Sequence, residues 1–267
     1  MRLVSIASGS SGNSTYIGSE ETHLLVDAGI SCRRMEKGLE TLGIRADELG
    51  ALVLTHEHND HIRGISVFLK HHRIPVYATE GTLRAMRRAG VFDQVPDAEE
   101  LLHAVKTEST FRVGDIDILP FPIDHDAAEP AAYRFRCGEK ACAVATDLGH
   151  YTEETVRYLK GLDALLLESN HDVRMLEAGP YPYSLKRRIL GSLGHLSNED
   201  AGHLLSRLLD GRLRHVALAH LSRENNLPEL ARETVRCEIA ESSARLIAAD
   251  VPIAVARRDE ISDIFDF

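Results

Sequence analysis

The chain has 267 residues, of which 43% are hydrophobic and 27% are charged, a balance typical of an ordinary folded protein with a sizeable core. No run of about 18 apolar residues occurs, so we expect no transmembrane helix, and the N-terminal residues 1–6 lack the features of a signal peptide. The formal net charge of −10 argues against a general attraction to nucleic acid but does not exclude a local basic face.

The four cysteines are Cys32, Cys137, Cys142 and Cys237, and no two of them form a C-x-x-C pair. Cys137 and Cys142 flank a predicted hairpin turn, where two small buried thiols are more common than a disulfide. We therefore expect free thiols and a protein of the reducing cytoplasm.

The N-terminal part of the chain predicts three short strands, at 2–7, 14–18 and 23–27, and then a helix at 31–43. A Gly/Ser-rich loop separates the first two strands. Such a loop can hold a phosphate through backbone N–H groups, although most such loops are plain turns. Asp27 ends the third strand, either as a turn or cap residue or as a carboxylate that orients a neighbouring group.

The stretch 52–61 holds the densest group of metal-binding residue types. An apolar strand is followed directly by His56, His58, Asp60 and His61. Imidazole suits zinc, iron and similar metals, and a carboxylate adds an oxygen donor. In an extended backbone His56 and His58 point the same way, whereas the adjacent Asp60 and His61 diverge and can serve a second metal. This stretch therefore predicts two metal positions, and a merely histidine-rich loop is the less favoured alternative.

The rest of the chain alternates strands with helices. Strands are expected at 75–78, 101–105, 109–113, 116–121, 131–137, 141–145, 164–167, 214–219 and 251–255. Helices are expected at 62–71, 80–89, 152–160, after the capping residue Ser197, and at 229–245. Two strand-rich segments, each followed by helices, predict two packed sheets with helices outside.

Three of these strands end in further residues of metal-binding type. His125 lies between two aspartates after the strand at 116–121, Asp147 follows the strand at 141–145, and His220 ends the strand at 214–219. A histidine buried in the core is the alternative for His125, because its spacing from the central motif is variable.

With the motif at 56–61 followed by His125, Asp147 and His220, the sequence resembles the metallo-β-lactamase-fold hydrolases. Within that superfamily it is similar to the YycJ-like (WalJ) branch, related to the nucleases RNase J and RNase Z. The segments that carry this similarity are 8–13, 125–127, 194–198, 220–222 and 225–226. The resemblance implies a single domain over 1–267 of the α/β (α+β) class. Its architecture would be a four-layer αβ/βα sandwich of two packed mixed β-sheets with helices outside.

The resemblance also implies two divalent metal ions, zinc or manganese, with iron also compatible. One ion would be bound by His56, His58 and His125. The second would be bound by Asp60, His61 and His220, and Asp147 would bridge both ions.

Further site residues follow from the same resemblance. His195 precedes a capped helix, as does a histidine of the related nucleases that contacts the scissile phosphate or protonates the leaving oxygen. His195 is therefore expected to be catalytic. Asp60 of the central motif is also expected to be catalytic. Asp27 is expected to orient a ligating histidine, and the residues expected to contact ligands or substrate are Ser10, Asn13 and Asn226.

Two metals about 3.5–4 Å apart lower the pKa of a shared water, and the bridging hydroxide can then attack in line. The resemblance implies a phosphodiesterase, and in particular a 5′→3′ exonuclease on DNA, with DNA favoured over RNA as substrate. A hydrolase of a small thioester, lactone or cyclic phosphodiester is the alternative that the acidic charge favours. A non-catalytic metal-binding regulatory module is a third hypothesis. No membrane partner is expected, and the sequence predicts no particular oligomeric state.

Overall fold

The computed structural model describes residues 1–242 and 251–267, and its described strands form two seven-stranded mixed sheets. The first sheet has the order β14-β1-β2-β3-β4-β5-β6. Its strands are β1 (Arg2–Ala7), β2 (Ser14–Gly18), β3 (His23–Val26), β4 (Leu49–Val53), β5 (Val76–Thr79), β6 (Leu102–Val105) and β14 (Phe265–Asp266). Strands β3 to β6 run parallel to one another, and the remaining pairs are antiparallel.

The second sheet has the order β13-β12-β11-β10-β9-β8-β7 and repeats this arrangement. Its strands are β7 (Phe111–Val113), β8 (Ile116–Pro122), β9 (Ala131–Cys137), β10 (Lys140–Ala145), β11 (Ala164–Glu168), β12 (His215–Ala219) and β13 (Ile253–Val255). Strands β10 to β13 are parallel, and β7 to β10 pair antiparallel. Every residue of β11 is buried, as expected for an apolar strand covered on both faces.

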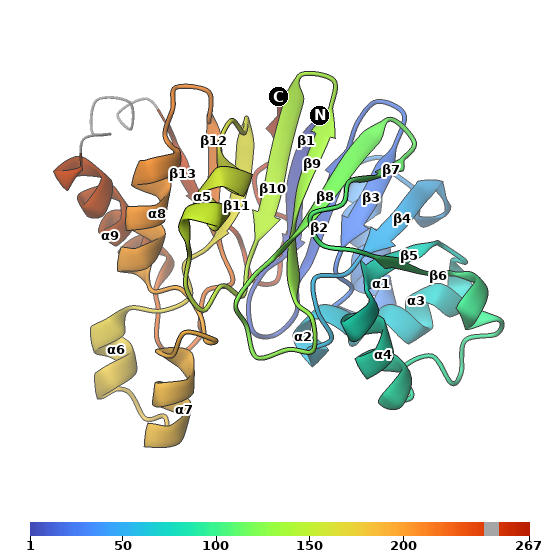
Figure 1. Ribbon diagram of the computed structural model, residues 1–267, viewed down its shortest axis with the longest axis horizontal. Coiled ribbons are helices and arrows are strands. Elements are labelled where there is room, and N and C mark those ends of the chain that lie inside the picture. The colour runs from blue at the N-terminus through green and yellow to red at the C-terminus, as the bar shows by residue number, and fades with distance from the viewer. Residues whose placement is uncertain (243–250) are drawn as a thin grey trace.

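Helices cover the outer faces of both sheets (Figure 1). On the first sheet lie α1 (Cys32–Thr41), α3 (Ile65–His71) and α4 (Glu80–Arg88), and on the second lie α5 (Glu153–Leu159), α8 (Asn198–Leu208) and α9 (Pro228–Glu241). Short helices at one edge are α2 (Asn59–Ile62), α6 (Val173–Ala178) and α7 (Tyr183–Ile189), and the 3₁₀ turns are Ala46–Glu48 and Ala98–Glu100. One apolar cluster lies between the sheets and one under each helical layer. The predicted four-layer sandwich is confirmed.

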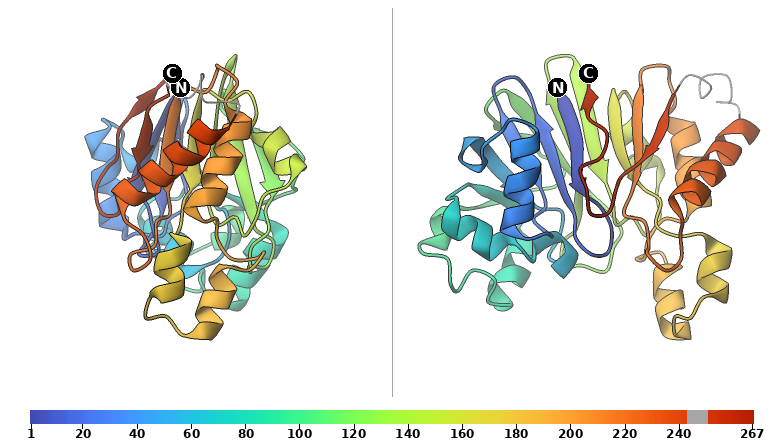
Figure 2. Two further views of the ribbon diagram at one scale, coloured as in Figure 1. Left: turned by 90° about the vertical axis from the view of Figure 1, so that its left-hand side faces the viewer. Right: turned by 180° about the vertical axis from the view of Figure 1, so that it is seen from behind.

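The two ends of the chain lie side by side (Figure 2). The amino group of Met1 donates a hydrogen bond of 2.6 Å to the carbonyl of Phe267, next to the β1–β14 pairing. None of the described helices has the length and apolar character needed to cross a membrane.

Several elements differ from the sequence-based expectation. The helix expected at 62–71 begins only at Ile65, as α3, and the separate short helix α2 precedes it. Between them the backbone N–H of Gly64 donates to the carbonyl of Ala28 at 2.8 Å and not to the preceding helical turn. The helices α6 and α7 and the strand β14 were not predicted. Of the helix expected at 229–245, the structure shows α9 and residue 242, and 243–245 lie outside the described residues.

Candidate metal centre

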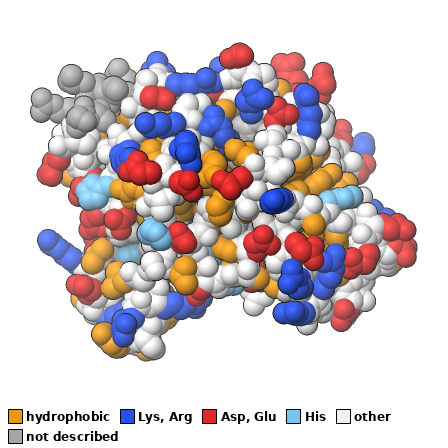
Figure 3. Space-filling view, viewed as in Figure 1, with side chains coloured by type: hydrophobic (Ala, Val, Ile, Leu, Met, Phe, Trp, Pro, Cys, Tyr) orange, Lys and Arg blue, Asp and Glu red, His pale blue; other side chains and the backbone are white. Residues whose placement is uncertain are grey.

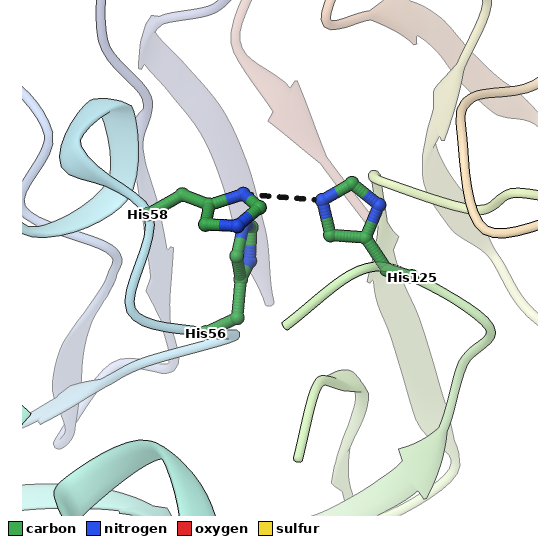
Figure 4. A group of neighbouring side chains, drawn as sticks. All are labelled: His56, His58 and His125. Atoms are coloured by element: carbon green, nitrogen blue, oxygen red, sulfur yellow. Dashed lines mark hydrogen bonds between the residues drawn. The ribbon is translucent and has the colours of Figure 1, made fainter. Parts of the chain in front are cut away.

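Three histidine rings meet at the edge of the sandwich where β4 and β8 end. His56 and His58 follow β4, and His125 follows β8 (Figure 4). Nδ1 of His58 lies 3.2 Å from Nε2 of His125, and Nδ1 of His56 lies 3.0 Å from Oγ1 of Thr55. One nitrogen of each ring lies within 4.8 Å of the other two, close enough for one ion to contact all three.

A second group combines a carboxylate with two histidines. Asp60 and His61 lie in α2, and His220 follows β12. Oδ2 of Asp60 is 3.3 Å from Nε2 of His220 and 3.7 Å from Nε2 of His61. The opposite nitrogen of His61, Nδ1, is 2.7 Å from Oδ2 of Asp27. That carboxylate holds the ring through Nδ1, as carboxylates commonly do behind histidine ligands, so Nε2 is the nitrogen that an ion would contact.

Asp147 lies between the two groups. It follows β10 and is only 1% exposed. Its Oδ2 atom is 3.3 Å from Nε2 of His61, and its Oδ1 atom is 3.9 Å from Nε2 of His125. Its Oδ1 atom is also 3.4 Å from Nδ1 of His220. Because its oxygens lie within 4 Å of histidines from both groups, this carboxylate is placed to contact ions in both.

Three of these residues have an unusual backbone. Asp27, Asp147 and His220 have φ values of 64°, 62° and 56°, and each comes within two residues of the end of a buried strand. Aspartate and histidine are enriched among the few non-glycine residues that accept positive φ. Such a conformation costs about 1–3 kcal/mol and concentrates at functional sites. The fold therefore maintains local strain where these side chains enter the site.

The residues present fit a pair of divalent cations. Nε2 of His56 and Oδ2 of Asp147 are buried and make no hydrogen bond with any described residue. A buried polar atom without a partner costs about 1–3 kcal/mol, and an ion between the two groups would satisfy both. Five histidines and two carboxylates also form the mixed nitrogen and oxygen donor set that zinc, manganese and iron accept.

Burial and charge give the histidines different protonation states. Burial lowers the pKa of His56 well below its ordinary value, and the neighbouring histidines add to the effect. Burial alone would also lower the pKa of His61, but the carboxylates of Asp147 and Asp27 outweigh it and raise that pKa to about 9. The surrounding carboxylates likewise raise the pKa of His220. In the metal-free protein His56 is neutral, and His61 and His220 hold protons that an ion would replace.

We expect metal binding to the second group to weaken as the pH falls below about 9, the pKa of His61. At pH 7 an ion in the second group must displace the protons of both His61 and His220, so the apparent affinity falls by at least about tenfold for each unit of pH. Calorimetric titration with zinc in buffers of different ionisation enthalpy should detect the release of about one proton or more per chain at pH 7. Identical heats in all buffers would contradict a protonated His61.

The same pKa predicts how the stability of the metal-free chain depends on pH. The ordinary histidine pKa is about 6.5, and that of His61 in the folded state is about 9. Its stabilising contribution is therefore complete below about pH 6.5 and is lost as the pH rises to about 9. The melting temperature of metal-free protein should fall over this interval, and bound zinc should remove the fall.

A carboxylate to which the sequence analysis assigned no role lies behind the second group. Glu168 ends β11 and is fully buried. Its Oε1 atom is 2.9 Å from Nδ1 of both His195 and His220, and Oε2 accepts the backbone N–H groups of Leu148 and Leu196. Burial would raise its pKa, but the two histidines hold that pKa well below its usual range. Glu168 therefore fixes the orientation of both rings as an ionised group.

A pocket of about 230 Å³ opens over both groups. The side chain of His195 is 20% exposed and lines it. Because Glu168 engages Nδ1 of His195, Nε2 is the ring nitrogen available to a bound molecule. The pocket is also lined by residues of or near the two groups, among them His58, Asp60, Asp147, His220, Ser10, Asn170 and Ser222, and by residues of the 181–189 segment.

The remaining predicted residues lie at different depths. Ser10 lines the pocket, whereas the buried Asn13 places its amide nitrogen 3.1 Å from Nε2 of His61. Asn226 donates to the carbonyls of Ser169 and Asn170 at 2.9 and 3.0 Å. Within the described chain Asn226 neither lines this pocket nor contacts a ligand candidate. It holds the backbone that follows Glu168.

Comparisons with known proteins identify the family and the fold of this chain. The family model described as "Beta-lactamase superfamily domain" matches residues 22–220. Exodeoxyribonuclease YycJ of Bacillus anthracis is 40% identical over 230 residues, which are 86% of this chain and 86% of that protein. Exodeoxyribonuclease WalJ of Streptococcus pneumoniae serotype 2 is 39% identical over 237 residues, 89% and 87% of the two chains. Zinc-bound PqqB from Methylobacterium extorquens has the same fold, with a TM-score of 0.71 over 100% of both chains at 18% identity.

Proposed function

Because this chain belongs to the metallo-β-lactamase superfamily and is a homologue of YycJ and WalJ, we propose that it is a metal-dependent exonuclease that degrades DNA from the 5′ end. The observation that carries the proposal is the pair of donor groups joined by Asp147 beneath one open pocket. Relatives whose names state an exodeoxyribonuclease activity support DNA as the substrate.

In this proposal each donor group holds one divalent ion, zinc or manganese, with iron also compatible. His56, His58 and His125 would hold the first ion, and Asp60, His61 and His220 would hold the second, with Asp147 beside both groups. When bound, two such ions acidify water and stabilise the charge that develops on phosphate oxygens. Asp27 and Glu168 hold His61 and His220 in the orientations that the ions require.

The protein's own groups place the substrate. His195 presents Nε2 to the pocket, and we assign it to a phosphate oxygen of the substrate or to protonation of the leaving oxygen. Asp60 lines the same pocket beside His220 and is the carboxylate assigned to orienting the attacking water. Burial favours the neutral form of Asp60, but His220 and His61 hold its pKa well below the usual range, so it accepts hydrogen bonds near neutral pH.

The shape of the pocket favours a polymer over a small molecule. Sites that enclose small molecules are commonly about 300–1,000 Å³ and bury most of the ligand. The pocket here is about 230 Å³, below that range, and is partly open. It suits one phosphodiester that a longer chain presents better than a ligand that the site must enclose.

The test is cleavage of a 5′-phosphorylated linear DNA duplex, labelled at its 3′ ends, by protein loaded with zinc or manganese. We expect shortening from the 5′ end, and little or no shortening of a matched RNA. Asp60→Ala should reduce the rate by at least about a hundredfold. The matched control is Asp47→Ala, because Asp47 lies on the surface in a pair with Arg45 and should be dispensable.

Three other outcomes of this cleavage assay would contradict part or all of the proposal. Shortening from the 3′ end would contradict the polarity, and cleavage of RNA alone would contradict the substrate. No cleavage of either polymer by protein with both ions bound would favour the hydrolase of a small molecule, to be assayed with thioester, lactone and cyclic phosphodiester compounds.

A further inference from the structure

A helical segment beside the pocket has no role in the site described above. Residues 173–193, here called the arm, comprise α6, α7 and the residues that connect and follow them. Figures 1 and 2 show α6 and α7 projecting beyond the ends of the strands. Leu176 is the single buried residue of α6, and α7 has none. Packing against the core therefore does not explain why the arm is present.

The arm forms one side of the pocket. Tyr181, Leu185, Arg188 and Ile189 line the same cavity as the ligand candidates. A phosphate bound in this pocket therefore lies beside the arm. The arm is continuous with the site and is not a separate surface.

The charge of the arm is opposite to that of the rest of the chain. It contains Arg174, Lys186, Arg187 and Arg188 against the single acid Glu177, a net charge of +3, whereas the whole chain has −10. Among the described residues, no ion pair involves Arg174 or Arg187, and Arg188 pairs with Asp126 at 2.5 Å. Free cations concentrated beside the site of an acidic protein favour a polyanionic partner.

The arm also exposes apolar side chains. Tyr183 is 75% exposed, Leu193 50% and Leu190 44%. Figure 3 shows hydrophobic and basic side chains together on this projection. An exposed aromatic ring beside cations is the combination with which proteins bind single nucleic-acid strands, because bases stack on the ring while the cations contact phosphates.

We propose that the arm binds the DNA strand that is being cut, on the nucleotides next to the phosphodiester in the pocket. Arg187 and Arg174 contact backbone phosphates, and Tyr183 stacks on a base. This inference rests on the proposed nuclease function and adds the surface that holds the polymer.

The test compares the metal-loaded wild type with Tyr183→Ala and Arg187→Ala, neither of which lines the pocket. Each variant should raise KM for the DNA by about tenfold while kcat changes by less than about twofold. Arg187→Ala should also reduce the slope of log(kcat/KM) against log[salt] by about one. Hydrolysis of bis(4-nitrophenyl) phosphate should stay unchanged, because this small diester needs only the pocket.

Arg157→Ala is the matched control, since Arg157 is also exposed but lies on α5, outside the arm. Arg187→Lys should keep the salt slope. A wild-type KM and salt slope in both arm variants would overturn the inference and leave the nuclease function standing. Loss of small-diester hydrolysis in the arm variants would show that the arm maintains the structure of the site instead. If the wild type forms a dimer that the arm variants do not form, the arm serves self-association instead. A wild type that cuts no DNA would overturn both proposals.

Discussion

Replacing Asp147 with asparagine is expected to lower the rate of DNA cleavage by at least about a thousandfold, a loss of about 4 kcal/mol of transition-state stabilisation. Asp147 is buried, and its oxygens lie within 4 Å of histidines from both donor groups. An asparagine would remove the negative charge and direct an N–H₂ group at imidazole nitrogens or at an ion. Metal analysis after dialysis should show at most one ion per chain in the variant, against two in the wild type.

Asparagine is the informative replacement because it keeps the size of the side chain and tolerates a left-handed backbone, such as the φ of 62° at this position. A change in activity is then attributable to the lost charge and not to the turn. Asp47→Asn provides a surface control with an unchanged rate and metal content. Two bound ions and a wild-type rate in the Asp147 variant would contradict its place between the two groups.

The metal-binding residues could be predicted from the sequence because each belongs to a local pattern, either the short motif at 56–61 or the end of an apolar strand. In the stretch 56–61, side-chain direction follows from backbone conformation, so spacing alone separates His56 and His58 from Asp60 and His61. The assignment of His125 and His220 to these two groups came from the resemblance. His125, Asp147 and His220 could be singled out because each follows an apolar strand. The apolar runs likewise predicted most strands and the layered fold, because burial on both faces leaves a continuous hydrophobic pattern.

The part that the sequence could not predict depends on strand order. Glu168 also ends an apolar strand, but its role follows from β11 lying between β10 and β12, which places it behind His195 and His220. No local spacing contains that information. The arm was missed for a different reason: with only Leu176 buried, it has no apolar stripe from which helical periodicity could be recognised.

Replacing Glu168 with glutamine is expected to destabilise the protein by about 1–3 kcal/mol and to lower kcat/KM by about 10- to 100-fold. The carboxylate accepts four N–H groups: two imidazole Nδ1 groups on Oε1, and the backbone groups of Leu148 and Leu196 on Oε2. A glutamine has one acceptor oxygen, so either amide orientation sets its N–H₂ group against two donors. The histidine rings lose their anchor even though no ligand candidate has been changed.

Stability and positioning can be separated by measuring each directly. Melting temperatures of metal-free protein report the unsatisfied donors, while zinc titration well below the melting transition reports the orientation of His220. If Glu168 acts only on folding, Glu168→Gln will melt earlier but bind zinc and cleave DNA like the wild type. If it also orients His220 and His195, zinc affinity and kcat will both fall at a temperature where the variant is fully folded. Glu153→Gln, on the exposed end of α5, should change neither quantity, because Glu153 lies outside the pocket and its hydrogen bond to Arg207 is at the surface.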